Sequence, residues 1–307
     1  MALLDLILDP LNFEFMRRAV IVATVASIVC ALLSCWLILI GWSLMGDAIS
    51  HAVLPGVALA YLFGAPFALG ALAFALAAVA MIGTIRRTSR VKEDAAMGIV
   101  FTALFALGLV LISRNPAQVD LMHILFGNLL GIPSADLWQV VILGALAAIV
   151  LIAKRRDLTL YAFDKTHAQA IGISAGKLGA LLLGLLAVTI VVALQAVGVI
   201  LVVALLITPG ATAYLLTSRF NRMLVLAPVI AVVCSFAGIY SSYYYDASTG
   251  GMIVLAQSTA FALAYLFSPS QGLVTGLVTH RRTAPAPNTP RDLAPATNAT
   301  GRAGAES

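Results

Sequence analysis

Charged side chains are scarce in this sequence. Asp, Glu, Lys and Arg make up 10% of the 307 residues, against roughly a quarter in an ordinary soluble domain. Hydrophobic residues make up 62%, and the mean hydropathy is +1.04. This composition excludes a water-soluble globular protein and indicates a polytopic membrane protein.

Alternation of apolar and polar residues is also missing. The stretch AVIVATVASIVCALLSCWLILIG, residues 19–41, is almost continuously apolar. A transmembrane β-strand alternates between a lipid-facing and a lumen-facing side, so this pattern excludes a β-barrel. We therefore expect an all-α membrane protein.

Cysteine is rare, and the positions of the three residues indicate neither a disulfide nor a metal site. Cys30, Cys35 and Cys234 all lie inside apolar stretches, where a thiol behaves as a small hydrophobic group. Neither a disulfide framework nor a thiolate metal site is expected. A cleavable signal peptide is not evident either, because acidic residues precede the first apolar stretch and no small-residue cleavage site follows.

Two catalytic motifs are absent. Without G-x-x-x-x-G-K-[ST] the chain cannot bind ATP through a P-loop. Without H-E-x-x-H or another cluster of His and carboxylates, an intramembrane metallohydrolase lacks its three protein ligands. We expect no enzyme and no nucleic-acid partner, so energy for any active process must come from a partner protein.

Nine apolar stretches reach or approach the length of about 20 residues that one membrane crossing requires. Several are short, and the second, third and seventh contain Gly and Pro, so we expect eight or nine transmembrane helices. The stretches are 17–41, 48–64, 66–84, 95–113, 137–153, 177–196, 197–217, 223–245 and 252–268.

The basic residues predict which connections face the cytoplasm. Fifteen of the 18 Lys and Arg residues lie in 86–94, 154–177, 218–222 and the tail after 280, and such segments are retained inside. The connections 114–136 and 243–250 then lie outside. Nine full crossings leave Arg17 and Arg18 outside, which conflicts with this rule unless a short stretch fails to cross or the chain starts as an interfacial helix.

One carboxylate and one imidazole lie where lipid or packed helices are expected. In GWSLMGDAISHAVLPGVALAYLFG, residues 41–64, Asp47 and His51 are four residues apart. On a helix they share one face, and their oxygen and nitrogen suit Mn, Fe or Zn. Two ligands hold an ion weakly, as a transport pathway requires. The alternative is that Asp47 caps a helix at the membrane surface.

This stretch resembles the signature of the permease subunits of bacterial ATP-binding-cassette importers for manganese, iron and zinc, the ABC-3 family. Three further segments resemble that family in the same order, so the likeness covers about residues 12 to 270: AFDKTHAQAIGIS (162–174), QAVGVILVVALLITPGATAYLLTSRF (195–220) and SSYYYDASTGGMIVL (241–255).

The resemblance implies a type II importer-like permease in the bacterial cytoplasmic (inner) membrane. Such a permease dimerises around a central pathway, receives metal from an extracytoplasmic metal-binding lipoprotein and is driven by a cytoplasmic ATP-binding subunit. The family's intramembrane Asp and His fall on Asp47 and His51, and Pro55 and Gly56 just beyond them fit a gate. The metal is cargo, with no resident cofactor.

The preceding residues LILIGWS resemble the second of two non-identical permeases in manganese and iron systems. The resemblance therefore leaves open whether the second permease is a sister permease or a second copy of this chain. Mn or Fe is the first expected cargo, and Zn is the next. A carrier driven by an ion gradient remains the alternative, and it would not need an ATPase.

The segment 154–177 is expected to be the cytoplasmic coupling segment of a permease domain spanning 1–270. Phe163, Ala168 and Ile171 form the predicted face toward the ATPase, while Asp164 caps a short helix and Gly172 ends it. The simpler interpretation is a connector whose Lys and Arg residues fix topology. Residues 271–307, rich in Pro, Ala and Thr, are expected to be a disordered cytoplasmic tail.

Overall fold

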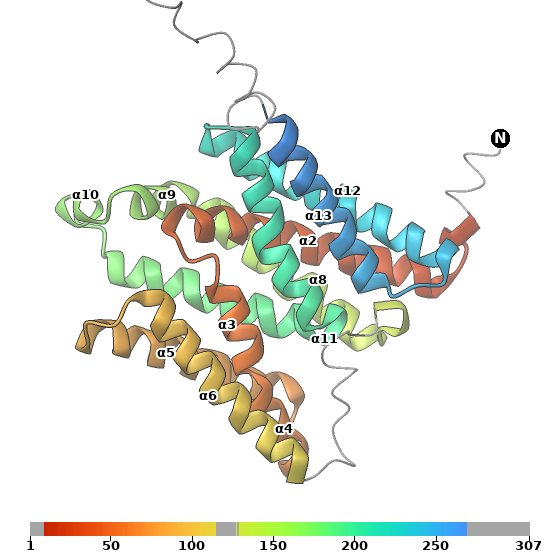
Figure 1. Cartoon of the computed structure of the whole chain (residues 1–307), viewed down its shortest axis with the longest axis horizontal. Helices are drawn as coiled ribbons and strands as arrows, with labels where there is room; N and C mark the ends of the chain where they lie inside the picture. Colours follow the sequence, from red (N-terminus) through yellow and green to blue (C-terminus); the bar gives the residue numbers. More distant parts are fainter. Residues whose placement is uncertain (1–8, 115–126, 128, 269–307) are drawn as a thin grey trace, which may run out of the picture.

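The computed structural model describes residues 9–114, 127 and 129–268, and within these ranges every regular element is a helix (Figure 1). This confirms the all-α prediction. The predicted tail 271–307 and most of the connection 114–136 lie outside the described residues. The elements are α2 (Glu14–Ile40), α3 (Met45–Ala52), α4 (Leu54–Phe63), α5 (Phe67–Thr88), α6 (Glu93–Arg114), the 3-10 turn η1 (Leu129–Gly131), α8 (Ser134–Ala153), α9 (Arg155–Phe163), α10 (Lys165–Ala170), α11 (Ala175–Leu216), α12 (Phe220–Tyr245) and α13 (Thr249–Phe267).

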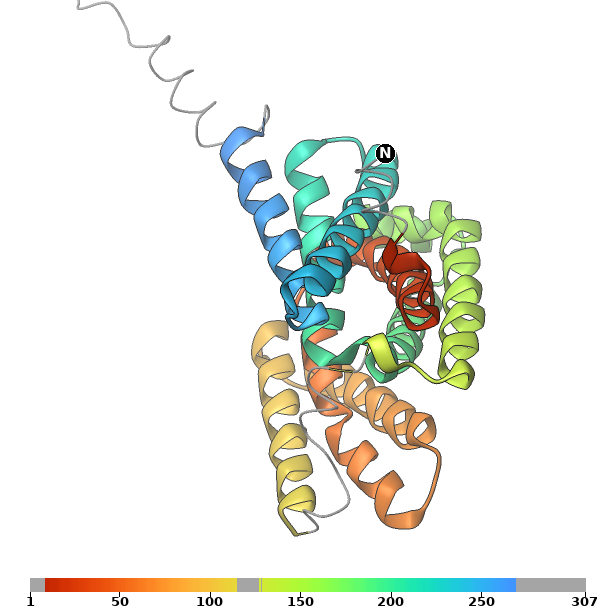
Figure 2. The same ribbon diagram turned by 90° about the vertical axis from the view of Figure 1, so that its right-hand side faces the viewer.

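Two helices form the centre of the molecule. Among the described residues, eight helical segments are long and apolar enough to cross a membrane, counting α3 and α4 as one. In α2 and α11, 72% of the most apolar window is buried, against 17% in α13. Figure 2 shows α2, in red, enclosed by other helices, and its neighbours include α8, α11 and α12. The outer helices turn large apolar side chains outward, as lipid-facing helices do.

Small residues allow the helices to approach closely. α5 buries one stripe of small and apolar residues, Ala71, Ala75, Ala78 and Ile82, at helical spacing. Such stripes are typical of helix contacts in membranes, where lipid is as apolar as protein and tight packing replaces the hydrophobic driving force.

α11 is a pair of helices joined at Gly198. Its 42 residues are about twice the length that a bilayer requires. Gly198 has φ 79° and ψ 166°, a conformation that essentially only glycine adopts. The break lies at the boundary between the predicted stretches 177–196 and 197–217.

Both ends of α11 lie at the same end of the bundle. Near its start, Gly179 lies against the Tyr161 hydroxyl of α9. Just beyond its end, the Phe220 ring lies 6.3 Å from the ring of Phe163, also in α9. The chain therefore turns back at Gly198, and the eight segments make nine crossings.

The basic connections gather at one end of the bundle, which we call the basic end. Trp42, between α2 and α3, has the guanidinium of Arg86 5.7 Å and the ammonium of Lys165 5.6 Å from its ring centroid. At the opposite end, the ring of Phe13 lies 6.3 Å from that of Tyr243. By the distribution of Lys and Arg, the basic end is the cytoplasmic one.

The start of α2 therefore lies opposite the basic end, so Arg17 and Arg18 remain exceptions to the charge rule. Against a short interfacial helix or a stretch that fails to cross, α2 and the segments next to it are long and apolar enough to span a bilayer. Arg18 forms an ion pair with Glu14 one turn earlier, which offsets part of its charge.

Candidate metal site

The Asp47 and His51 pair lies on α3, where both side chains are partly exposed. α3 packs against α6 and α11. The His51 ring packs against two rings of α6, with its centroid 5.2 Å from that of Phe101 and 5.3 Å from that of Phe105. Both phenylalanines lie near the middle of α6, whose 22 residues span a bilayer. His51 therefore lies level with the middle of α6, which favours an intramembrane position over a helix cap at the membrane surface.

The two side chains have the spacing of metal ligands. His51 Nε2 lies 3.4 Å from Asp47 Oδ1. Two ligands bound at about 2.1 Å to a tetrahedral or octahedral ion lie about 3.0 to 3.4 Å apart. The side chains are 37% exposed for Asp47 and 24% for His51. The pair therefore opens on a face of the single chain.

A single chain supplies only part of a metal site. Within the part of the chain that the structure describes, no group of three or more His, Cys, Asp or Glu side chains is arranged to hold a metal ion. Among the described His, Cys, Asp and Glu side chains, Asp47 and His51 therefore have no third ligand beside them.

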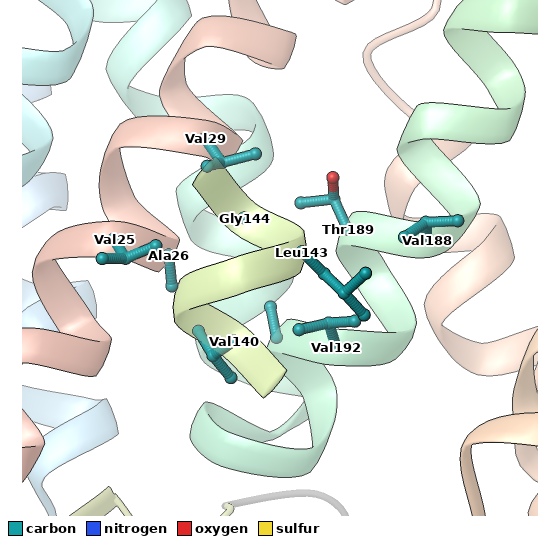
Figure 3. A pocket seen from close by; sticks show the side chains of 10 residues that line it. Val25, Ala26, Val29, Val140, Leu143, Gly144, Val188, Thr189 and Val192 are labelled. Atoms are coloured by element: carbon teal, nitrogen blue, oxygen red, sulfur yellow. The ribbon is translucent and has the colours of Figure 1, made fainter. Parts of the chain in front are cut away.

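A small cavity between α2, α8 and α11 does not provide such a site. Its lining is almost wholly aliphatic, and its volume is about 10 Å³ (Figure 3). The only polar side chain in the lining is Thr189, whose buried hydroxyl has no hydrogen-bond partner. One neutral hydroxyl cannot hold a divalent cation in an apolar site.

Comparison with known proteins places the chain in a family. The model of the ABC 3 transport family matches residues 12–268. The chain belongs to the ABC-3 transport family. It is therefore a multi-pass membrane protein of the transport permease class.

Relatives of this ABC-3 protein are similar over nearly their whole length. It is 50% identical over 268 residues to the manganese transport system membrane protein MntB of Synechocystis, covering 87% of this chain and 88% of the relative. It is 45% identical over 272 residues to the chelated iron transport system membrane protein YfeC of Yersinia pestis, covering 89% and 92%. The solved structure of PsaBC from Streptococcus pneumoniae in complex with Fab superimposes with a TM-score of 0.79 at 38% identity, covering 88% of this chain and 97% of that one.

Pro55 and Gly56, the predicted gate of this ABC-3 protein, belong to the first turn of α4. Pro55 lies in the first turn of the helix, where backbone N–H groups have no partner within the helix, so the N–H that proline lacks is not needed there. A Cβ atom added to Gly56 would lie 2.1 Å from the Gly70 carbonyl oxygen of α5. Gly56 therefore allows α4 and α5 to pack backbone to backbone, and a role in gating stays a prediction.

The coupling segment contains two short helices, α9 and α10, at the basic end. Asp164 caps α10, since its Oδ1 accepts a hydrogen bond of 2.8 Å from the His167 N–H. Gly172 follows the helix with φ +85°, and the Ile173 N–H donates to the Ala168 carbonyl at 3.0 Å. These bonds form a Schellman ending, so both predicted boundaries are confirmed.

The predicted docking face is wrong at Ala168. Phe163 is 65% exposed and Ile171 is 54% exposed, whereas Ala168 is fully buried. α10 packs against α9 and α11, and a buried residue on so short a helix faces them. Ala168 therefore supports the position of α10, and the exposed apolar residues are Phe163 and Ile171.

Sequence reasoning missed the aromatic surroundings of His51. Phe101 and Phe105 are one helical turn apart on α6, about fifty residues beyond His51. Their spacing was visible in the sequence, but aromatic residues are ordinary in apolar helices, so only the packing of α3 on α6 reveals their contact with the imidazole.

Proposed function

We propose that this chain is the membrane permease subunit of an ATP-binding-cassette importer for Mn²⁺ or Fe²⁺, with Zn²⁺ as the next candidate. The observation that carries the proposal is the Asp47 and His51 pair, at ligand spacing and with His51 packed against the middle of the apolar helix α6. Ionisable groups are costly within a membrane and mark ion pathways. The names of the manganese and chelated-iron relatives support the choice of metal.

The ion pathway requires a second permease. Two ligands from one chain leave the coordination of a divalent ion incomplete. Because the pair opens on an exposed face, a second copy or a sister permease on that face supplies the matching ligands. Two such chains present two carboxylates and two imidazoles to one ion. Transport also requires that the ion leave readily, which suits a site assembled from two halves.

A cytoplasmic ATP-binding subunit contacts the basic end in this proposal. α10 is held by its Asp164 cap and Gly172 ending, with Phe163 and Ile171 exposed beside it. A capped helix with adjacent exposed apolar residues fits a groove on a partner. An extracytoplasmic metal-binding protein delivers the ion at the opposite end.

The deciding experiment measures cellular metal content. Mn, Fe and Zn are quantified by elemental mass spectrometry in cells that lack the complete transporter and in cells that express it. We expect accumulation of Mn or Fe, which is lost when the P-loop lysine of the partner ATPase is replaced. Uptake that survives this replacement would favour the gradient-driven carrier, and no change in any metal would reject the metal cargo.

A further inference from the structure

A pocket of about 340 Å³ opens at the basic end, between α5 and the first half of α11. It is separate from the Asp47 and His51 pair, and it adjoins α9 and α10, the segment that the proposed function places next to the ATP-binding subunit. Its polar rim is formed by Arg86 and Arg87 of α5, with Trp42 and Tyr161 beside them. Its deeper wall consists of small and aliphatic residues of the two helices, among them Gly83.

The rim carries more positive than negative charge. Lys165 lies over the rings of both Trp42 and Tyr161, at 5.6 and 5.4 Å from their centroids. Arg86 is bonded to Glu93 at 2.7 Å. Within the described residues, no carboxylate forms an ion pair with Arg87 or Lys165. Arg87 in the lining, and Lys165 over the two lining rings, thus lack a carboxylate counter-charge within the part of the chain that the structure describes.

The rim aromatics hold Arg86 and Lys165 in place. Trp42 and Tyr161 are almost fully buried, so their rings are fixed, and a fixed ring face attracts an ammonium or guanidinium group. Tyr161 adds a phenol, and burial raises the pKa of this group further above its ordinary value. The rim therefore presents cations and a neutral hydroxyl, the groups that a phosphate selects.

The wall of the pocket extends into the membrane. From Arg87 to Val79, both in the lining, α5 rises by about 12 Å over eight residues. That distance is a large fraction of one leaflet of a bilayer whose apolar core is about 30 Å thick. A Cβ atom at Gly83 or Gly176 would have no neighbour within 4 Å. Side chains of this protein therefore leave the space along the wall unfilled.

We propose that this pocket binds an anionic phospholipid of the cytoplasmic leaflet. The phosphate lies at the rim by Arg87 and Lys165, and an acyl chain lies along the wall past Gly83. Basic pockets between membrane helices on the cytoplasmic side recognise anionic headgroups in this way. A free phosphate would use the rim but would leave the apolar wall empty, and a water-soluble partner does not reach the depth of Val79.

The first test removes the charges. The full-length chain is purified in detergent, and bound phosphatidylglycerol and phosphatidylcholine with identical acyl chains are compared by native mass spectrometry. We expect the Arg87→Gln, Lys165→Gln double variant to lose the preference for phosphatidylglycerol by about fivefold or more, as removal of two cations near one phosphate predicts. The matched control, Arg90→Gln with Lys92→Gln, changes exposed residues of the same basic connection outside the pocket lining and retains the preference.

The second test fills the wall. Gly83→Leu adds a side chain to open space and displaces the lipid, while Gly98→Leu on α6, also facing open space, does not. Gel filtration checks that each variant is folded, and if Gly83→Leu is not, the charge variants alone decide. If both double variants lost the preference for phosphatidylglycerol equally, that preference would come from general surface charge and the proposal would be overturned. Displacement of the lipid by inorganic phosphate, with no discrimination between the two lipids, would identify a free-phosphate site and overturn the proposal. An unchanged preference for phosphatidylglycerol in the Arg87→Gln, Lys165→Gln double variant would overturn the proposal as well.

Discussion

The first two crossing segments, α2 and the α3–α4 pair, are consecutive in the chain but are built in different ways. α2 is a single helix of 27 residues with no charged side chain beyond Arg18. The α3–α4 pair has 19 residues, is interrupted at Val53 and contains Asp47 and His51. Both segments are mainly buried, at 72% and 67% of their apolar windows.

The difference shows what burial alone does not specify. α2 is apolar on all sides and is held by packing against its neighbours, as expected for a central helix. α3 carries two ionisable groups, which are costly within a membrane, although apolar residues would be more stable there. In the function proposed above, this cost is offset by ion binding, so irregularity and polarity in a buried segment point to function more strongly than burial does.

The sharpest test of this contrast compares polar residues of the two segments. Asp47→Ala and His51→Ala each remove one of the two ligands, so we expect metal uptake to fall to the level of cells without the transporter. Ser27→Ala in α2 removes one side of a buried hydrogen bond of 2.6 Å to Ser235 and should leave uptake nearly unchanged. Metal content per cell and the amount of chain in the membrane are measured together. Normal uptake by both α3 variants would remove the pair from the pathway.

The next test concerns the close packing of α4. Gly56→Leu would force a side chain into the Gly70 backbone, at a cost on the order of 3 kcal/mol. We expect little folded protein by gel filtration in detergent. Gly83→Leu, at an open position of α5, should give normal amounts. If Gly56→Leu folds as well as Gly83→Leu, the contact between α4 and α5 is looser than described.

A smaller effect is expected at the turn within α11. Alanine at Gly198 must adopt a positive φ, which costs on the order of 1–3 kcal/mol. Gly184→Ala, at an open and regular position of the same helix, should be neutral or slightly stabilising. Thermal unfolding in detergent compares the two. A lower midpoint for Gly184→Ala than for Gly198→Ala would contradict a sharp turn at Gly198.

The smallest effect is expected outside the membrane, at α10. Asp164→Ala removes the cap and should weaken the first turn of α10 by about 1 kcal/mol. Hydrogen exchange at the amide of His167 should accelerate, with little change in global stability. Asp164→Asn restores a capping acceptor and should restore protection. Equal exchange in the alanine and asparagine variants would show that the cap does not hold this helix.

Local features were predictable from the sequence. The boundaries of α10 followed from Asp164 and Gly172, because capping depends on residues a few positions apart. The break at Gly198 coincided with a predicted boundary between two apolar stretches. The inward side of α10 was not predictable, since the burial of Ala168 depends on α9 and α11, which the pattern of a six-residue helix does not specify.

The sequence by itself determined that this chain is a helical membrane protein and that Asp47 and His51 share one helix face. Hydropathy and helical periodicity act over a few turns, so they need no tertiary contacts. Only the tertiary structure decided that Phe101 and Phe105 pack against the imidazole and that Trp42 gathers cations at the basic end. Those contacts join distant segments through shape and small-residue packing, because in a membrane lipid-facing and protein-facing surfaces are equally apolar.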